Sequence, residues 1–373
     1  MSSIEIKKVE SKKDLQAFIK FPWSIYKNDP YWVPHLITER KKILNKEKNP
    51  FFEHADAEYF LAYKDGKLSG RIAAIINELH NKYHNDNAGF FGFFECVNDQ
   101  KVADALFNTV KEWLKLKGID EMLGPANFSS NDEWGMLIEG FEDSPRILMT
   151  YNPKYYLDLC DNYGFKKAKD LFAYKLVSEK VYASDKLTRV QQLARDRYKL
   201  KIRSLDMKNF KKELENVKYL YNKAWAPNWG FIPMTDAEID AMAKELKPLV
   251  EPSLVLFGEI EGQLIGFALV IPDYNEILKT MNGRLLPFNF IKIFTQRKNI
   301  KWARIITLGI IPEHQKKGLD AVFYWEIVNR AKKIGILLGE ASWVLEDNEM
   351  MNRGAHVMNG EVYKKYRIYS LKF

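Results

Sequence analysis

The sequence predicts a mixed α/β protein with two similar halves, each a mixed, mostly antiparallel twisted sheet flanked by helices. Three observations predict this fold class. With 373 residues, of which 46% are hydrophobic and 14% aromatic, the chain can bury more than one core. The same strand–turn–strand pattern occurs twice, at corresponding places in the chain. Each copy precedes a strand, a helix and another strand, and such a crossover adds parallel pairing to an antiparallel hairpin.

The repeat is clearest at the two hairpins. Gly66 and Gly262 each lie in a short turn between two apolar runs, which is a strong hairpin signal. Gly70 and Gly266 follow them at the same distance, so both pairs are 196 residues apart. We therefore expect a duplicated fold.

The two halves are expected to be domains at residues 1–180 and 199–373. Residues 181–198 lie between them and are rich in charge. Leu187, Val190 and Ala194 recur there at helical spacing, so we expect a helical linker rather than a flexible one.

The helices and strands of each half follow from periodicity and from end signals. Gly118 and Gly335 each end a helix, and Thr235 with Glu238 forms a capping box that begins one. We expect helices at 12–20, 36–44, 102–117, 208–225, 235–246 and 319–334. Besides the hairpins, we expect strands at 89–97, 303–310, 340–345 and 362–371.

Composition narrows the function. The chain has 57 Lys and Arg against 49 Asp and Glu, and this net charge of +8 is spread along its length. An anionic small ligand, a phosphate-bearing cofactor or a membrane surface suits that surplus, and no nucleic acid is expected. The polar start and the absence of an apolar run of about 18 residues favour a cytoplasmic protein. Two cysteines cannot form a disulfide framework or a zinc site by themselves, and we expect no metal.

One loop carries the strongest chemical signal. Residues 307–321 lead a strand into a helix through a polar segment that contains Lys316, Lys317 and Gly318. The start of a helix presents unpaired N–H groups, and Gly318 would let a phosphate approach them. An ordinary strand-to-helix turn is the alternative interpretation.

This loop resembles the acyl-CoA pyrophosphate loop of the GNAT acetyltransferase superfamily, because Ile-Pro is followed by Gln315-x-x-Gly318 at the start of a helix. The resemblance covers nearly the whole chain as two GNAT-like domains in tandem. The first copy has no glycine at the corresponding place, 98–101, and is degenerate. The resemblance implies acyl-CoA as co-substrate, bound by Leu308, Gly309, Ile310, Gln315, Lys316, Lys317, Gly318, Leu319 and Asn348. Asn348 is equally well explained as a helix N-cap.

The loop departs from the family pattern at Asp320. A carboxylate that faced the pyrophosphate would repel it. If it pointed outward from the helix start, it would instead stabilise the helix dipole.

The resemblance also indicates catalytic candidates. The family's tyrosine acid, four residues before the turn glycine, corresponds to His356, with Tyr363 and Tyr366 as alternatives. Glu346 or Asp347, at the end of the core strand, would be the base that neutralises the amine. Surface positions and helix-start charges are the competing explanations.

Two segments are candidates for the acceptor site. The loop that overhangs the thioester in the family corresponds here to Trp225, Asn228, Trp229 and Phe231, and core packing is the alternative. The insertion 125–148 is long for a structureless loop. From it Asp132, Glu133 and Trp134 are expected to reach the acceptor.

The sequence thus predicts an acyl-CoA-dependent N-acyltransferase that moves an acetyl or longer acyl group to a small-molecule or lipid-like amine. A non-catalytic GNAT-like binding or scaffold protein is the alternative. Residues 278–304 mix apolar and basic side chains, which would suit peripheral membrane contact. A helix packed with its basic side in water explains the same pattern.

Overall fold

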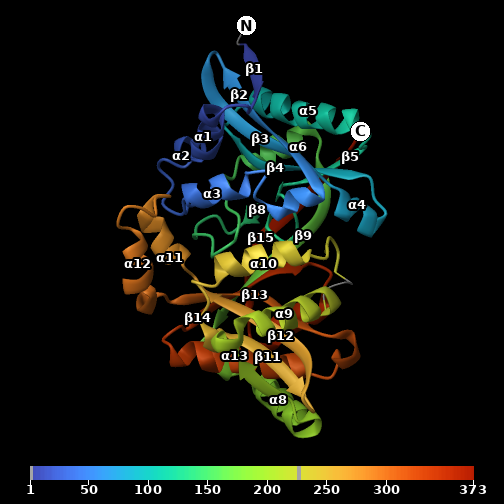
Figure 1. Cartoon of the computed structure of the whole chain (residues 1–373), viewed down its shortest axis with the longest axis vertical. Helices are drawn as coiled ribbons and strands as arrows, with labels where there is room; N and C mark the ends of the chain where they lie inside the picture. Colours follow the sequence, from blue (N-terminus) through green and yellow to red (C-terminus); the bar gives the residue numbers. More distant parts are fainter. Residues whose placement is uncertain (1–2, 225–227) are drawn as a thin grey trace. The chain divides into compact units, whose positions relative to one another are not determined.

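The computed structural model describes residues 3–224 and 228–373 of the chain, which form two compact units (Figure 1). Unit 1 comprises Met1–Asp170, Met281–Leu285 and Lys365–Phe373. Unit 2 comprises Leu171–Thr280 and Leu286–Lys364. Each unit is a mixed sheet with helices, as the sequence predicts.

Unit 1 contains the first hairpin and the strands that follow it. Its strand order is β1 (Ile4–Lys8), β2 (Ala55–Lys64), β3 (Lys67–Asn77), β4 (Ala88–Cys96), β5 (Glu121–Gly124) and the end of β15 (Glu361–Lys372). Neighbours are antiparallel, except that β4 and β5 are parallel. Its helices are α1 (Lys12–Lys20), α2 (Pro22–Ile25), α3 (Ile37–Ile43), α4 (Glu78–His84), α5 (Gln100–Leu116) and α6 (Tyr156–Tyr163).

Unit 2 repeats this plan. Its strand order is β9 (Lys166–Val177), β14 (Leu338–Leu345), β13 (Trp302–Ile310), β12 (Gln263–Pro272), β11 (Val255–Ile260) and β10 (Lys201–Ser204), and β13 and β14 are the parallel pair. Its helices are α7 (Ser178–Tyr182), α8 (Asp185–Tyr198), α9 (Phe210–Ala224), α10 (Asp236–Leu246), α11 (Asn275–Leu278), α12 (Phe290–Thr295), α13 (Leu319–Lys333) and α14 (Glu349–Val357).

The repeated glycines occupy equivalent positions in the two units. Gly66 and Gly262 both have positive φ, +75° and +79°, in the tight turns of their hairpins. A Cβ atom on Gly70 would lie 3.2 Å from the carbonyl oxygen of Glu95 on β4, and one on Gly266 would lie 2.5 Å from that of Gly309 on β13. Both copies thus have a glycine where two strands approach one another, and the approach is closer in the second copy.

The final strand of each half belongs to the unit of the other half. From Leu171 onward β9 pairs with β14 in unit 2, whereas Tyr369–Lys372 of β15 pair with β5 in unit 1. The division of the chain by contacts therefore differs from the halves 1–180 and 199–373, which assign each final strand to its own half. Those halves stay a prediction about the duplication.

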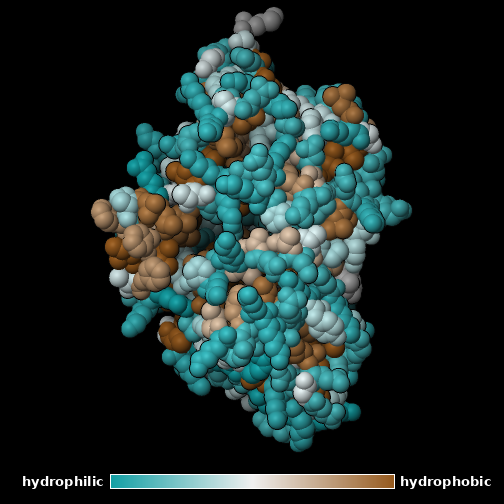
Figure 2. All heavy atoms as spheres, in the orientation of Figure 1, coloured by the Kyte–Doolittle hydropathy of each residue, from teal (hydrophilic) through white to brown (hydrophobic). Residues whose placement is uncertain are grey.

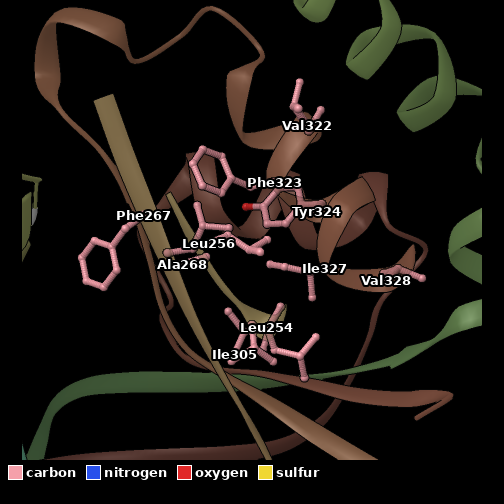
Figure 3. Close-up of a cluster of buried hydrophobic side chains, with 14 of the residues drawn as sticks. Leu254, Leu256, Phe267, Ala268, Ile305, Val322, Phe323, Tyr324, Ile327 and Val328 are labelled. Atoms are coloured by element: carbon pink, nitrogen blue, oxygen red, sulfur yellow. The ribbon is translucent and has the colours of Figure 1, made fainter. Parts of the chain in front are cut away.

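The core of unit 2 fixes the position of α13 (Figure 3). Phe323 and Ile327, one helical turn apart, lie on the face of α13 that packs against Leu254 and Leu256. A Cβ atom on Gly258 would lie 2.6 Å from the ring of Phe323, so this glycine makes room for it. The start of α13 is thereby held at the end of β13.

Most expected elements are confirmed within about three residues. The helix expected at 235–246 begins with the expected capping box. The segment 181–198 is mostly helical, as expected, because it contains α8, but it lies within unit 2 and not between the two units. The insertion 125–148 is more structured than a loop, because it contains β6 (Ala126–Asn127), β7 (Glu133–Trp134) and β8 (Met136–Glu139). In the described ranges, no helix combines the length and apolar character that a membrane span requires.

Candidate functional site

Strands β13 and β14 of unit 2 part from one another halfway along their length. Their parallel pairing runs from Trp302 opposite Leu338 to Ile305 opposite Ala341. The antiparallel pairing of β13 with β12 continues further, to Ile310. An extended ligand with its own amide groups can bind along such a released strand edge as an additional strand would.

A buried hydroxyl lies in this released part of β13. The Oγ1 atom of Thr307 is buried and has no hydrogen-bond partner among the described residues. An unpaired buried polar group costs about 1–3 kcal/mol, which a ligand that bonds to it would recover. Leu308 and Ile310 are buried with their side chains in the core, so they would contact a ligand through their backbone.

The loop after β13 is shaped by side-chain bonds to its own backbone. Gln315 donates from Nε2 to the carbonyl oxygen of Ile310 at 2.8 Å, and Lys317 donates from Nζ to that of Glu313 at 2.8 Å. Lys316 is exposed and has a φ of +59°. These bonds hold the loop so that it ends at the first turn of α13.

Gly318 is the N-cap of α13 and has a φ of +72°, so the helix begins without a side-chain cap from this residue. A Cβ atom at this position would lie 3.0 Å from a methyl group of Val190 on α8. The glycine is thus required by backbone conformation and by packing, in addition to any ligand. Leu319, the next residue, is buried.

Asp320 lies in the first turn of the same helix and is partly buried. Burial raises the pKa of its carboxyl group, and the nearby N–H groups of residues 320 and 321 lower it less strongly. A phosphate at this helix start would therefore lie close to a carboxyl group, and the repulsion between them stays a prediction.

A buried polar cluster lies where the pairing of β13 and β14 ends. Arg304 and Glu340 are opposite one another in the sheet and are 3% and 0% exposed. Ser342 donates from Oγ to Glu340 at 2.6 Å and accepts a bond from Nε of Arg304 at 2.9 Å. Tyr363 on β15 also donates its hydroxyl to Glu340, and its ring stacks near Trp302.

Sequence reasoning found only Tyr363 of this cluster. The signal for the others was a charged residue inside an otherwise apolar strand, at Arg304 and at Glu340. Such residues are almost never fully buried unless they are paired.

The two other catalytic candidates lie elsewhere on unit 2. Glu346 follows β14, and its carbonyl oxygen accepts a bond from Asn352 at 3.2 Å. His356 is exposed on α14, with its ring 5.6 Å from that of Tyr174.

Asn348 joins two predicted groups of residues. Its side chain accepts from the N–H of Met351 at 3.1 Å, which makes it the N-cap of α14. Its Nδ2 donates to Oδ1 of Asn228 at 3.3 Å, so the predicted acceptor loop contacts the helix that follows the core strand. In that loop Trp229 is 38% exposed, whereas Phe231 is buried beside Tyr221. Trp225 lies outside the described residues.

In unit 1 the equivalent positions are occupied by the protein's own side chains. Asn127 of the insertion accepts from the N–H of Phe93 on β4 at 2.6 Å. Asp99 caps the start of α5 by accepting from the N–H groups of Lys101 and Val102. These bonds agree with a first copy that binds no donor, and the degeneracy of that copy stays a prediction.

The predicted acceptor residues of the insertion bond within unit 1. Glu133 is paired with the buried Arg40 and accepts from Asn127 at 2.6 Å. Burial raises the pKa of Glu133, but Arg40 and then His35 outweigh it and lower the pKa to about 2. Asp132 accepts from the hydroxyl of Ser129 at 2.9 Å. Trp134 is 5% exposed, with its ring 6.3 Å from that of Phe90.

A pocket of about 480 Å³ adjoins the loop that follows β13. It is lined by Tyr219 and Lys223 of α9, residues 262–264 of the second hairpin, and Ile311, Glu313 and His314. Lys223 pairs with Glu313 at 2.9 Å across it. Nowhere in residues 3–224 and 228–373 do three or more His, Cys, Asp or Glu side chains form a group that could hold a metal ion.

Two proteins are similar to the chain over nearly its whole length. The bacterial ceramide synthase of Caulobacter vibrioides is 34% identical over 374 residues, which cover 97% of this chain and 95% of that protein. The protein YghO of Escherichia coli is 33% identical over 367 residues, 96% of this chain and 93% of that protein. No protein-family model matches the sequence.

Solved structures share the fold. A tandem GNAT protein from the clavulanic acid biosynthesis pathway covers 99% of this chain and 98% of its own, with a TM-score of 0.58 and 8% identity. A probable N-acyltransferase from Enterococcus faecalis covers 100% of this chain and 73% of its own, with a TM-score of 0.54 and 10% identity. At these identities the likeness concerns the fold alone.

Proposed function

Since the chain belongs to the family of bacterial ceramide synthase and YghO and has the tandem GNAT fold, we propose that it transfers an acyl group from acyl-CoA to a lipid-like amine. Membership of this family makes the chain an acyltransferase. A ceramide is the amide of a fatty acid and a long-chain amino alcohol. The proposed acceptor is therefore a long-chain amine, and the proposed donor carries a fatty acyl chain.

The observation that carries the donor side of the proposal is the parting of β13 from β14 directly before the loop that ends at Gly318. The amide groups of a pantetheine arm match the released edge of β13, and the hydroxyl of Thr307 offers a further hydrogen bond there. The first turn of α13 offers N–H groups to the phosphates. Asp320 fits this ligand poorly, so its carboxylate is expected to limit donor affinity.

The reaction is direct amide formation. The amine nitrogen attacks the thioester carbon, the carbon–sulfur bond breaks, and the products are the amide and the free thiol of CoA. The nitrogen must lose a proton to attack, and the departing thiolate must gain one. N–H groups on the released edge of β13 would stabilise the oxyanion that forms in between.

We assign the proton transfer from the amine to Tyr363. Its hydroxyl donates to Glu340, so its oxygen lone pairs can accept a hydrogen bond from an ammonium group. Glu340 is fully buried and would accept the proton through the phenol rather than touch the acceptor itself. Arg304 and Ser342 hold Glu340 in place.

The remaining candidates keep subsidiary roles in the proposal. Glu346 is the alternative base, and His356 is the alternative acid for the thiolate. Asn228 and Trp229 would line the acceptor side, because Asn228 is bonded to Asn348 at the start of α14.

The test is amide synthesis by the purified chain from palmitoyl-CoA and the long-chain amino alcohol sphinganine. We expect equal amounts of amide, measured by mass spectrometry, and of free CoA thiol, measured with a thiol reagent. Acetyl-CoA and ethanolamine, the short counterparts, are expected to react much more slowly. Absence of amide with every one of these pairs would refute the proposed function.

Tyr363→Phe tests the proton role separately. We expect kcat to fall by about a hundredfold, the lower range for general base catalysis, with little change in KM for the donor. Tyr182→Phe is the matched control, because it also removes a phenol bonded in unit 2, to Asn329 at 2.7 Å on α13. If both variants keep wild-type kcat, the proton passes through another group.

A further inference from the structure

Unit 2 presents a concentrated set of exposed apolar side chains within residues 286–294. Phe288 and Phe294 are 73% and 71% exposed, and Leu286 is 67% exposed. Phe290 and Ile291 are 40% and 45% exposed. Figure 2 shows these hydrophobic residues gathered over α12, in an otherwise mostly hydrophilic face of the unit. Single exposed apolar residues are normal, whereas such a group marks an interaction surface.

This apolar segment is held to unit 2 by ordered contacts. The Nζ atom of Lys292 lies 3.4 Å from the carbonyl oxygen of Thr280, on the chain that precedes it. After the helix, Arg297 donates to the carbonyl oxygen of Val250 at 3.1 Å and to the carboxylate of Glu251 at 2.9 Å. Lys292 and Arg297 thus tie the segment and the chain after it to unit 2, while its apolar side chains remain exposed.

Charge distinguishes the kind of partner that this surface fits. Residues 278–304 contain seven basic residues and no acidic one. Arg304 and Arg297 bond to Ser342 and to Glu251, as described above, whereas Lys279, Lys298 and Lys301 are exposed on unit 2. Against a second copy of the chain these charges would repel one another, but an anionic surface would attract them.

We propose that residues 286–294 form a membrane-docking surface that enters the interfacial region of an anionic phospholipid bilayer. Phenylalanine and leucine side chains bury in the boundary between head groups and acyl chains, while neighbouring lysines remain with anionic head groups. The six residues of α12 are too short to span a bilayer, so the helix would lie in its surface. This docking does not depend on the proposed reaction, although it would bring the chain to lipid-like acceptors.

The test is binding of the full chain to vesicles, measured by co-sedimentation without substrate. We expect the wild type to bind vesicles of equal parts phosphatidylcholine and phosphatidylglycerol, and to bind pure phosphatidylcholine much less. Phe288→Ser combined with Phe294→Ser is expected to lower the partition coefficient at least about tenfold. Leu116→Ser, at an 86% exposed position of unit 1, is the matched control and should bind as the wild type does.

Lys298→Gln provides a second variant that leaves the apolar side chains intact. It should weaken binding about fivefold in low salt, and the difference should disappear in high salt. All the variants are expected to keep the wild-type melting temperature and amide synthesis with short soluble substrates, because the changes are at exposed positions.

Three outcomes would overturn the proposal. If the wild-type chain does not bind anionic vesicles, the proposed membrane-docking surface is excluded. Equal binding by the wild type and the double phenylalanine variant would place the membrane contact elsewhere. A wild-type dimer that the double variant converts to a monomer, with no vesicle binding by either, would show that the surface joins two copies of the chain.

Discussion

Replacing Asp320 by Asn should strengthen donor binding. Asp320 lies in the first turn of α13, where a phosphate would approach the N–H groups of the helix start. A phosphate placed there meets the negative charge of its carboxylate. Asparagine keeps the size and the hydrogen-bonding oxygen but removes the charge.

The magnitude follows from the distance and the surroundings. Two unit charges about 6 Å apart interact with about 3 kcal/mol at an effective dielectric constant of about 20. Asp320 is partly exposed, and screening by solvent and salt reduces this energy to about 1 kcal/mol. The variant should therefore bind acyl-CoA about fivefold more tightly at neutral pH.

The pH dependence has a definite sign. Burial raises the pKa of Asp320, so its carboxyl group takes up a proton at a higher pH than an ordinary aspartate. As pH falls through that pKa, the repulsion is lost and the wild-type dissociation constant should fall toward that of Asp320→Asn. The variant should lack this component of the pH dependence.

The assay is titration calorimetry with palmitoyl-CoA and with CoA at several pH values. Glu313→Gln is the control, because it removes a carboxylate of the same loop at an exposed position, where the effect should be under about twofold. Weaker donor binding by Asp320→Asn would refute the reasoning. It would mean that the carboxylate organises the helix start for the donor instead of competing with it.

Two further predictions concern stability. Gly318→Ala and Gly262→Ala both place an alanine at positive φ, which costs about 1 kcal/mol. Only the alanine at position 318 would also lie close to Val190, so Gly318→Ala should lower the melting temperature more. Of the two variants, only Gly318→Ala should weaken CoA binding. Equal losses of stability in the two variants would show that the Val190 side chain can move aside without a cost in free energy. Glu133→Gln leaves the buried Arg40 with only the partly exposed Glu39 as a counter-charge and should destabilise unit 1 by about 3 kcal/mol in urea unfolding. The pKa of Glu133 is about 2 in the folded protein, below its value in the unfolded chain. The ionised carboxylate should therefore stabilise the folded protein above the unfolded pKa, and this stabilisation should be lost as pH falls from about 4 toward 2. Glu133→Gln should show no such loss of stability.

Local signals in the sequence predicted much of the fold and the loop that is the candidate donor site. The hairpin glycines, the capping box of Thr235 and the glycine at the start of α13 each determine a few neighbouring residues, so a short pattern suffices. The loop of Gly318 was found in the same way, whereas the edge of β13 was expected only from the resemblance of that loop to the GNAT superfamily. It did not reveal that Gly318 also packs against α8, because that contact joins residues far apart in the chain.

Features that depend on distant partners were missed for the same reason. Glu340 has no local pattern that predicts its bonds to Tyr363 and Ser342. The burial of Asp320 depends on the residues packed around the start of α13, which a position in a helix does not give. Glu133, expected at the acceptor, is paired with Arg40, which lies 93 residues earlier.

The exchange of final strands has the form of a domain swap carried out within one chain. Duplication usually leaves one copy free to be lost, but here the first half supplies β9 to the sheet of unit 2. The reverse dependence also holds, because Tyr369–Lys372 of β15 form the strand next to β5. A stop codon a few residues before the C-terminus would thus damage unit 1, in the opposite half of the gene. Neither half can therefore be removed or exchanged as a module, because each supplies a strand to the sheet of the other unit.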